Sequence, residues 1–196
     1  MGKQGVTYRA VFAVAEFRWL WLAHALSVAG NQLARVALTV LVFDRTASAG
    51  LSALTYAVSY VPDLIGGAFL SGLADRYSRR TVMVVTDLLR AGLVAAMAIP
   101  GMPLAVQITL LVGVQLVAVP FQAARQAAMP NILSSDALAL GLGVMSMTYQ
   151  TALVLGFGVG ASVVAALGYY DALLLNAATF VLSAAIIRYG MRPHHP

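Results

Sequence analysis

Long apolar stretches alternate with short polar connectors along the whole chain. A helix needs about 20 predominantly apolar residues to cross the ~30 Å hydrocarbon core of a membrane. Six stretches are this long, and breakers such as Pro100-Gly101 and Pro130-Asn131 lie between them. The pattern predicts helices over residues 19–43, 51–73, 81–99, 103–126, 137–167 and 171–189. We therefore expect an all-α membrane protein in which residues 1–196 form a single bundle of six transmembrane helices.

Composition narrows the class of protein further. Hydrophobic residues make up 61 % of the chain and charged residues 10 %, whereas soluble domains have about 45–50 % and about 25 %. The sequence contains no cysteine, which excludes disulfides, thiolate zinc sites and a thiol nucleophile. It also contains no G-x-S-x-G elbow, H-E-x-x-H pair or P-loop. We expect neither enzymatic activity nor a cofactor or metal site.

Arginine and lysine gather at one set of helix ends. The positions on that side are Lys3, Arg9, Arg18, Arg76, Arg79, Arg80, Arg125, Arg188 and Arg192, against Arg45 on the other. Cytoplasmic connectors of membrane proteins carry an excess of these residues. The asymmetry predicts a multi-pass protein of the cell membrane with both termini in the cytoplasm. It also accounts for the net charge of +5 without nucleic acid as a partner.

Polar side chains recur along one face of several predicted helices. They are His24, Ser27, Asn31, Arg35 and Thr39 in 19–43, Gln107, Gln115, Gln122 and Arg125 in 103–126, and Ser52, Tyr56, Ser59, Tyr60 and Asp63 in 51–73. Polar groups inside a membrane usually face the bundle interior or a water-filled cavity. Alternatively, they hydrogen-bond between packed helices.

We interpret these stripes as the wall of an aqueous path for a small-molecule substrate. The candidate path residues are Asn31, Arg35, Tyr56, Tyr60, Asp63, Gln115, Gln122 and Tyr149. Arg35 and Asp63 lie on neighbouring helices and differ in depth by about four positions, or ~6 Å of helix rise. A long arginine side chain can cover that difference, so we expect the two to pair. Asp87 and Arg90, three residues apart on one helix, are expected to neutralise each other as a structural pair.

Two further signals have a structural interpretation. His24 lies near the cytoplasmic end of its predicted helix, and we expect it at the membrane interface rather than in a proton relay. Ala152, Gly156 and Gly160 follow one another at intervals of four residues. Small residues at this spacing let two helices approach closely, so Gly156 and Gly160 are predicted to be helix-packing positions.

The connector after residue 73 concentrates charge in a recognisable pattern. Its residues Gly72, Asp75, Arg76, Arg79 and Arg80 resemble G-x-x-x-D-R-x-G-R-R/K, the loop between the second and third helices of major facilitator superfamily transporters. The sequence departs from that loop at Ser78, where the family usually has Gly. The resemblance covers essentially the whole chain and implies one half, the amino-terminal six helices, of a twelve-helix fold. Residues 61–64, 87–91, 130–131 and 174–177 are similar to the branch containing macrolide-efflux and siderophore-export proteins.

The resemblance implies a secondary active transporter, an antiporter that exports a drug-like or siderophore-like molecule in exchange for protons. Its first and fourth helices would line the central cavity. The family's cytoplasmic latch falls here on Asp75, with Arg76, Arg79 and Arg80 in support. Asp63, as a deep carboxylate beside the expected path, is the candidate for proton coupling.

The implied partners are the lipid bilayer, the substrate and a carboxy-terminal six-helix half in the same parent chain or a separate one. That half would cover Asn31, Arg35, Asp63 and Gln115, which we expect to face lipid otherwise. A homodimer is the alternative cover. The alternative functions are a membrane permease subunit, and an assembly or scaffold protein without transport activity of its own.

Overall fold

The structure, a computed structural model, describes residues 7–62 and 77–192. Within these residues it contains seven helices and no strand. The helices are α1 (Tyr8–Ala13), α2 (Ala15–Thr46), α3 (Ala49–Val58), α6 (Arg79–Met97), α7 (Leu104–Ile132), α8 (Ser135–Leu167) and α9 (Tyr169–Gly190). In the described part of the chain, four helices are long and apolar enough to cross a membrane: α2, α7, α8 and α9.

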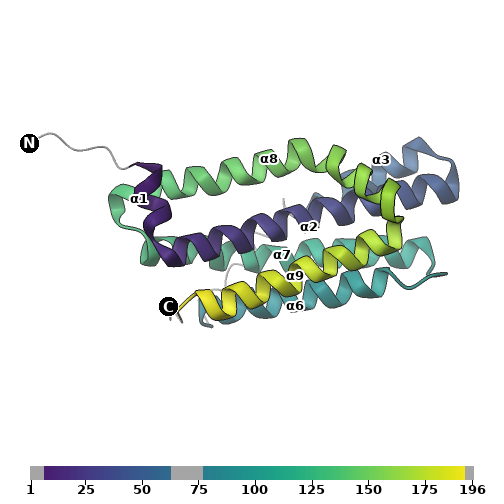
Figure 1. Cartoon of the computed structure of the whole chain (residues 1–196). Helices are drawn as coiled ribbons and strands as arrows, with labels where there is room; N and C mark the ends of the chain where they lie inside the picture. Colours follow the sequence, from purple (N-terminus) through teal and green to yellow (C-terminus); the bar gives the residue numbers. More distant parts are fainter. Residues whose placement is uncertain (1–6, 63–76, 193–196) are drawn as a thin grey trace, which may run out of the picture.

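The long helices form a bundle around α2. One side of α2 packs against α8, while α9 and α6 lie together on the other side, as Figure 1 shows. Helix α7 packs against α6 and also contacts α2. The most apolar stretch of α2 is 67 % buried, whereas that of α8 is 11 % buried. Helix α8 is therefore the helix that the rest of the described bundle covers least.

Serine side chains cap the first turns of two helices. The Ser48 side chain begins α3 by accepting a hydrogen bond from the Leu51 amide at 3.2 Å. The Ser78 side chain begins α6 by accepting one from the Thr81 amide at 3.3 Å. These bonds satisfy amide donors that have no partner within the first helical turn. Gly168, between α8 and α9, has a φ of 82° that a residue with a side chain rarely adopts.

Apolar side chains fill the bundle in two clusters, one toward each end. The cluster at the end where α2 begins includes Phe17, Leu20, Met83, Phe121 and Ile187. The cluster at the opposite end includes Leu38, Leu41, Leu111, Leu173 and Phe180. Four residues of the candidate path, Asn31, Arg35, Gln115 and Gln122, lie on α2 and α7, which contribute to both clusters.

Five of the six predicted spans each coincide with one helix, although the ends differ. Helix α7 continues to Ile132 rather than ending at residue 126, and so contains Pro130. A proline in the last turn removes one backbone hydrogen bond close to an end that frays in any case, so the helix survives it. Helix α3 covers the first part of the predicted span 51–73, and residues 63–73 lie outside the described residues. The number of six spans therefore stays a prediction.

The short helix α1 was not among the predicted elements. Its sequence is too short for a membrane span, but Val11 is fully buried. Val11 packs in the same cluster as Phe17, and the ring of Phe12 meets those of Phe17 and Trp21 edge to face. Helix α1 therefore closes the bundle at the end where α2 begins (Figure 1).

Candidate functional site

The centre of the polar stripe is Arg35 of α2, whose side chain is 3 % exposed. Its Nη1 donates to Gln32 Oε1 at 3.2 Å. Its Nη2 donates to the Ser59 carbonyl at 3.3 Å and to Gln115 Oε1 of α7 at 3.0 Å. One guanidinium thus ties α2 to α7 and to the turn that follows α3.

Aromatic side chains also surround the Arg35 guanidinium. The guanidinium of Arg35 lies over the Tyr60 ring, 3.8 Å from its centroid. The Tyr60 hydroxyl donates to the Tyr56 hydroxyl at 2.9 Å. The Tyr56 ring in turn meets the Phe157 ring of α8 edge to face, with 6.0 Å between the two ring centroids. We call Arg35, Gln115, Tyr56 and Tyr60 the Arg35 cluster.

The Arg35 cluster corrects one expectation. Arg35 and Gln115 were expected to face lipid unless a partner covered them, yet Gln115 is 1 % exposed within this chain. The physical reason is that the two side chains hydrogen-bond to each other across α2 and α7. The expected partner Asp63 lies outside the described residues, so the Arg35–Asp63 pair stays a prediction.

A cavity of about 260 Å³ lies between α2, α7 and α8, toward the end where α2 begins. Three candidate path residues line it: Asn31, Gln122 and Tyr149. Arg125 of α7 also lines it and is 8 % exposed. Asn31 lies one helical turn from Arg35, so the cavity and the Arg35 cluster form one continuous polar stripe along α2.

His24 also lines this cavity and is buried in the bundle, while its expected position at the membrane interface stays a prediction. The side chain is 3 % exposed, and its Nε2 lies 3.3 Å from the Met145 carbonyl of α8. The imidazole is enclosed because α8 packs against α2 at this level. Sequence spacing placed His24 on the stripe, but it did not show that another helix would cover that position.

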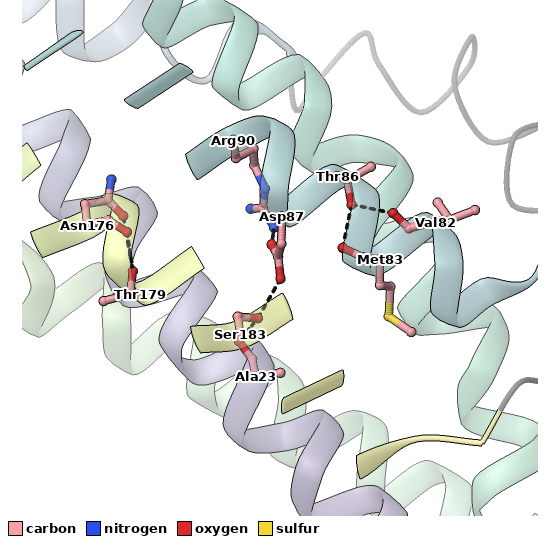
Figure 2. A network of polar contacts seen from close by, with 9 residues as sticks. All are labelled: Ala23, Val82, Met83, Thr86, Asp87, Arg90, Asn176, Thr179 and Ser183. Carbon is pink, nitrogen blue, oxygen red and sulfur yellow. Dashed lines mark hydrogen bonds and ion pairs between the residues drawn. The ribbon is translucent and has the colours of Figure 1, made fainter. Parts of the chain in front are cut away.

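A buried ion pair lies between α6, α9 and α2, next to the cavity that Arg90 also lines. Arg90 and Asp87 of α6 are paired, as predicted from their spacing. The Ser183 hydroxyl of α9 lies 2.6 Å from Asp87 Oδ2 and 3.1 Å from the Ala23 carbonyl of α2. Figure 2 shows this chain of contacts crossing three helices. The network joins three helices with its charge balanced, and a structural role for the pair stays a prediction.

The guanidinium of Arg90 is also held between two aromatic rings. Its central carbon lies 4.7 Å from the centroid of the Phe121 ring and 4.5 Å from that of Phe180. Arginine stacks favourably on aromatic faces when it is removed from water. Arg90 is therefore fixed in place by α7 and α9 as well as by its carboxylate.

The predicted packing glycines lie where α8 approaches α2. A Cβ atom added at Gly156 would stand 2.9 Å from the Cβ of Gln32. A Cβ atom added at Gly160 would stand 3.2 Å from the Cβ of Val36. Gly158, between them, has open space around it. The two glycines thus let the α8 backbone approach the helix that carries the polar stripe.

The ends of α2, α6 and α9 meet at one end of the bundle. Arg80 Nη1 donates to the Met191 carbonyl at 3.1 Å, and the Arg192 amide donates to Glu16 Oε1 at 2.9 Å. At the opposite end, Arg45 donates to the Met102 carbonyl at 2.8 Å. Gly72, Asp75 and Arg76 of the expected cytoplasmic gate motif lie outside the described residues. Arg79 and Arg80 of the same motif are the first two residues of α6.

Nothing in the described residues resembles a metal centre. They contain no group of three His, Asp or Glu side chains that could hold an ion. The chemistry available in the cavity is instead hydrogen bonding from amides, hydroxyls, an imidazole and arginine.

Comparison with known proteins gives one family. The sequence model of the Major Facilitator Superfamily matches residues 20–196. The chain belongs to this superfamily, whose members are membrane transporters and not enzymes. It is therefore a multi-pass membrane protein of the transporter class. No curated protein sequence matches the chain.

Proposed function

We propose that the chain is the amino-terminal half of a proton-coupled exporter of an amphipathic organic molecule. The observation that carries the proposal is the continuous polar stripe, in which the cavity at Asn31 adjoins the Arg35 cluster. Polar groups at membrane depth usually mark a substrate or ion pathway. The branch that exports macrolides and siderophores, which the sequence resembles, handles molecules of this kind.

The composition of the cavity wall supports an amphipathic substrate. Asn31, Gln122 and Tyr149 offer hydrogen bonds, while Phe121 and Leu142 offer apolar contact. Ligand sites usually combine a largely apolar wall with a few polar groups that fix orientation. Such a site binds a molecule with both a polar and a hydrophobic part.

Proton coupling is assigned to Asp63, next along the chain from the Arg35 cluster. In this proposal Asp63 carries the proton that is exchanged for the substrate. The Tyr60 ring and the Gln115 amide hold Arg35 in place. The replacement Asp63→Asn should abolish accumulation driven by a proton gradient and spare downhill exchange.

A second six-helix half is proposed to cover the open side of the cavity. Gln126 and Ser146 line the cavity and are exposed in this chain, and Gln150 is exposed on the next turn of α8. Polar side chains are costly against lipid, so another protein surface or water should lie there. In transporters of this type the substrate site lies between two such halves. A homodimer is the alternative cover.

The proposal also includes the orientation of the chain in the membrane and the latch on its cytoplasmic side. The end of the bundle that carries Arg18, Arg80 and Arg188 is assigned to the cytoplasm, and Arg45 marks the outer end. Asp75 is assigned to the latch that closes the cytoplasmic side. The replacement Asp75→Asn should then preserve insertion and lower flux, because the amide loses charge-assisted hydrogen bonds.

The test is efflux from energised cells that express the protein with whatever sequence its reading frame encodes after Pro196. Macrolides, catecholate siderophores and cationic dyes are the substrates to assay. We expect efflux of at least one that stops with a protonophore and with Asn31→Leu, while the lipid-face control Val181→Ala transports normally. Efflux unaffected by both the protonophore and Asn31→Leu would contradict the proposal.

A further inference from the structure

The cavity between α2, α7 and α8 contains a cation that has no opposite charge paired with it among the described residues. Arg125 is 8 % exposed, and its Nε has no hydrogen-bond partner. Within the described residues the Arg125 side chain makes no hydrogen bond and no ion pair. A charged side chain at membrane depth ordinarily pairs with an opposite charge or with backbone carbonyls. Arg125 therefore has hydrogen-bond donors available to a ligand in the cavity.

The second arginine of the cavity differs from Arg125 in this respect. Arg90 also lines the cavity, but Asp87 pairs with it, and Ser183 holds that carboxylate in turn. None of the described residues that line the cavity is an aspartate or a glutamate. The net charge that the described residues present to the cavity is consequently positive, and Arg125 is its source.

The neighbours of Arg125 would assist an anion. Gln122 lies one turn away on the same helix, and Ser146 and Tyr149 face the cavity from α8. Amide, hydroxyl and guanidinium groups all donate hydrogen bonds to a carboxylate. The planar fork of an arginine matches the two oxygens of a carboxylate in particular.

The remaining wall is apolar, which distinguishes an organic anion from an inorganic one. Val28, Phe121, Leu142 and Met145 line the cavity beside the polar groups. Its volume of about 260 Å³ is slightly below the ~300–1,000 Å³ of complete ligand sites. The cavity thus has room for the charged end of a molecule whose body extends beyond it.

We propose that this cavity binds the carboxylate of an amphipathic organic anion, with Arg125 as the group that pairs with it. This inference rests on the proposed function, since the cavity is taken as part of the substrate path, and it specifies the charge of the substrate. The pairing supplies the opposite charge that Arg125 lacks within the described chain.

Benzoate and benzamide test the proposal on the purified 196-residue chain in mild detergent. The two probes share a ring and a planar head group, and they differ in charge. We expect benzoate to raise the midpoint of thermal unfolding, because a ligand that binds the folded state stabilises it. Benzamide and sodium chloride at the same ionic strength should leave the midpoint unchanged. Equal shifts with benzoate and benzamide, or no shift with benzoate, would overturn the proposal.

Variants then assign the effect to Arg125. In Arg125→Gln the affinity for benzoate should fall by about tenfold to a hundredfold, the range for losing a charged hydrogen-bond partner. Arg125→Lys should recover part of it. Arg188→Gln is the matched control, because Arg188 is an exposed residue of α9 that does not line the cavity. An unchanged affinity in Arg125→Gln would contradict the assignment.

A protection experiment covers the case in which Arg125→Gln does not fold. The chain has no cysteine, so Ser146→Cys introduces a single thiol beside Arg125 in the cavity. Benzoate should slow its reaction with a thiol reagent, and benzamide should not. Equal protection by both would overturn the proposal. Efflux that fails while benzoate still binds would count against the proposed function and leave this inference standing.

Discussion

The guanidinium of Arg35 lies over the Tyr60 ring, 3.8 Å from its centroid. The same guanidinium donates to Gln115 Oε1 and to the Ser59 carbonyl. A single side chain therefore fixes the turn after α3 against α2 and α7.

Replacement of Arg35 by lysine tests how much the planar, forked guanidinium contributes to the stability of the fold. Arg35→Lys keeps the charge but cannot reach three acceptors and stack on Tyr60 together. We expect the unfolding free energy to fall by about 2–4 kcal/mol, from hydrogen bonds of a charged group and a desolvated cation–π contact. The measurement is unfolding in mixed micelles followed by circular dichroism. Arg45→Lys, at an exposed position, should cost less than about 1 kcal/mol.

The close contact between α8 and α2 gives a prediction with a control two residues away. In Gly156→Ala the new Cβ would stand 2.9 Å from the Cβ of Gln32, so the helices must separate. We expect a loss of about 1–3 kcal/mol of unfolding free energy, as for overpacked cores. Gly158→Ala meets nothing within 4 Å and should gain about 0.5–1 kcal/mol from helix propensity. Equal stabilities of the two variants would show that α8 does not pack on α2 in this way.

The hydroxyl of Ser183 connects α9 to the buried carboxylate of Asp87. Ser183→Ala removes the 2.6 Å contact with Oδ2 and should lower the unfolding free energy by about 1–3 kcal/mol. Asp87→Asn should cost more, about 3–5 kcal/mol, because it leaves Arg90 buried with its charge unbalanced. Ser162→Ala is the control, since that exposed hydroxyl bonds within its own helix. A Ser183→Ala variant as stable as Ser162→Ala would contradict the role assigned to the network.

The distribution of arginines predicts which end of the bundle faces the cytoplasm. Gly50→Cys introduces a thiol at the Arg45 end, where a Cβ has no closer neighbour than Ser48 Oγ at 3.9 Å. Ser135→Cys introduces one at the exposed start of α8, at the other end. We expect an impermeant thiol reagent to label Gly50→Cys in intact cells and Ser135→Cys after permeabilisation. The reverse pattern would invert the proposed topology.

Most of the long helices can be predicted from hydropathy, because the thickness of the membrane sets how long an apolar stretch must be to cross it. Five of the predicted spans each fall on one helix, and the Asp87–Arg90 pair follows from spacing on a single helix. Helix ends were less predictable. Pro130 was taken as a breaker, yet α7 runs through it to Ile132, since a proline in the last turn costs a single hydrogen bond.

The sequence could propose the members of the candidate site, whereas their contacts could not be read from it. Spacing placed Asn31 and Arg35 on one face of a helix, but it could not show which helix would meet that face. Tertiary packing decides the burial of Gln115 against Arg35 and the enclosure of His24 by α8. It also decides that Arg125 has no ion-pair partner among the described residues. Spacing placed Arg125 on the polar stripe of 103–126, but its burial beside the cavity could not be read from the sequence.

The central claim is that the cavity between α2, α7 and α8 is a water-filled path open toward the end of the bundle where α2 begins. The most direct measurement compares the thiol reactivity of Ser146→Cys, in the cavity, with that of Val181→Cys, which is 50 % exposed on the outer face of α9. The two positions lie at similar depths from that end. In inside-out membrane vesicles, an impermeant thiol reagent should label Ser146→Cys rapidly and leave Val181→Cys unlabelled. Equal and slow labelling of both would contradict the account, because the cavity would then be closed to water.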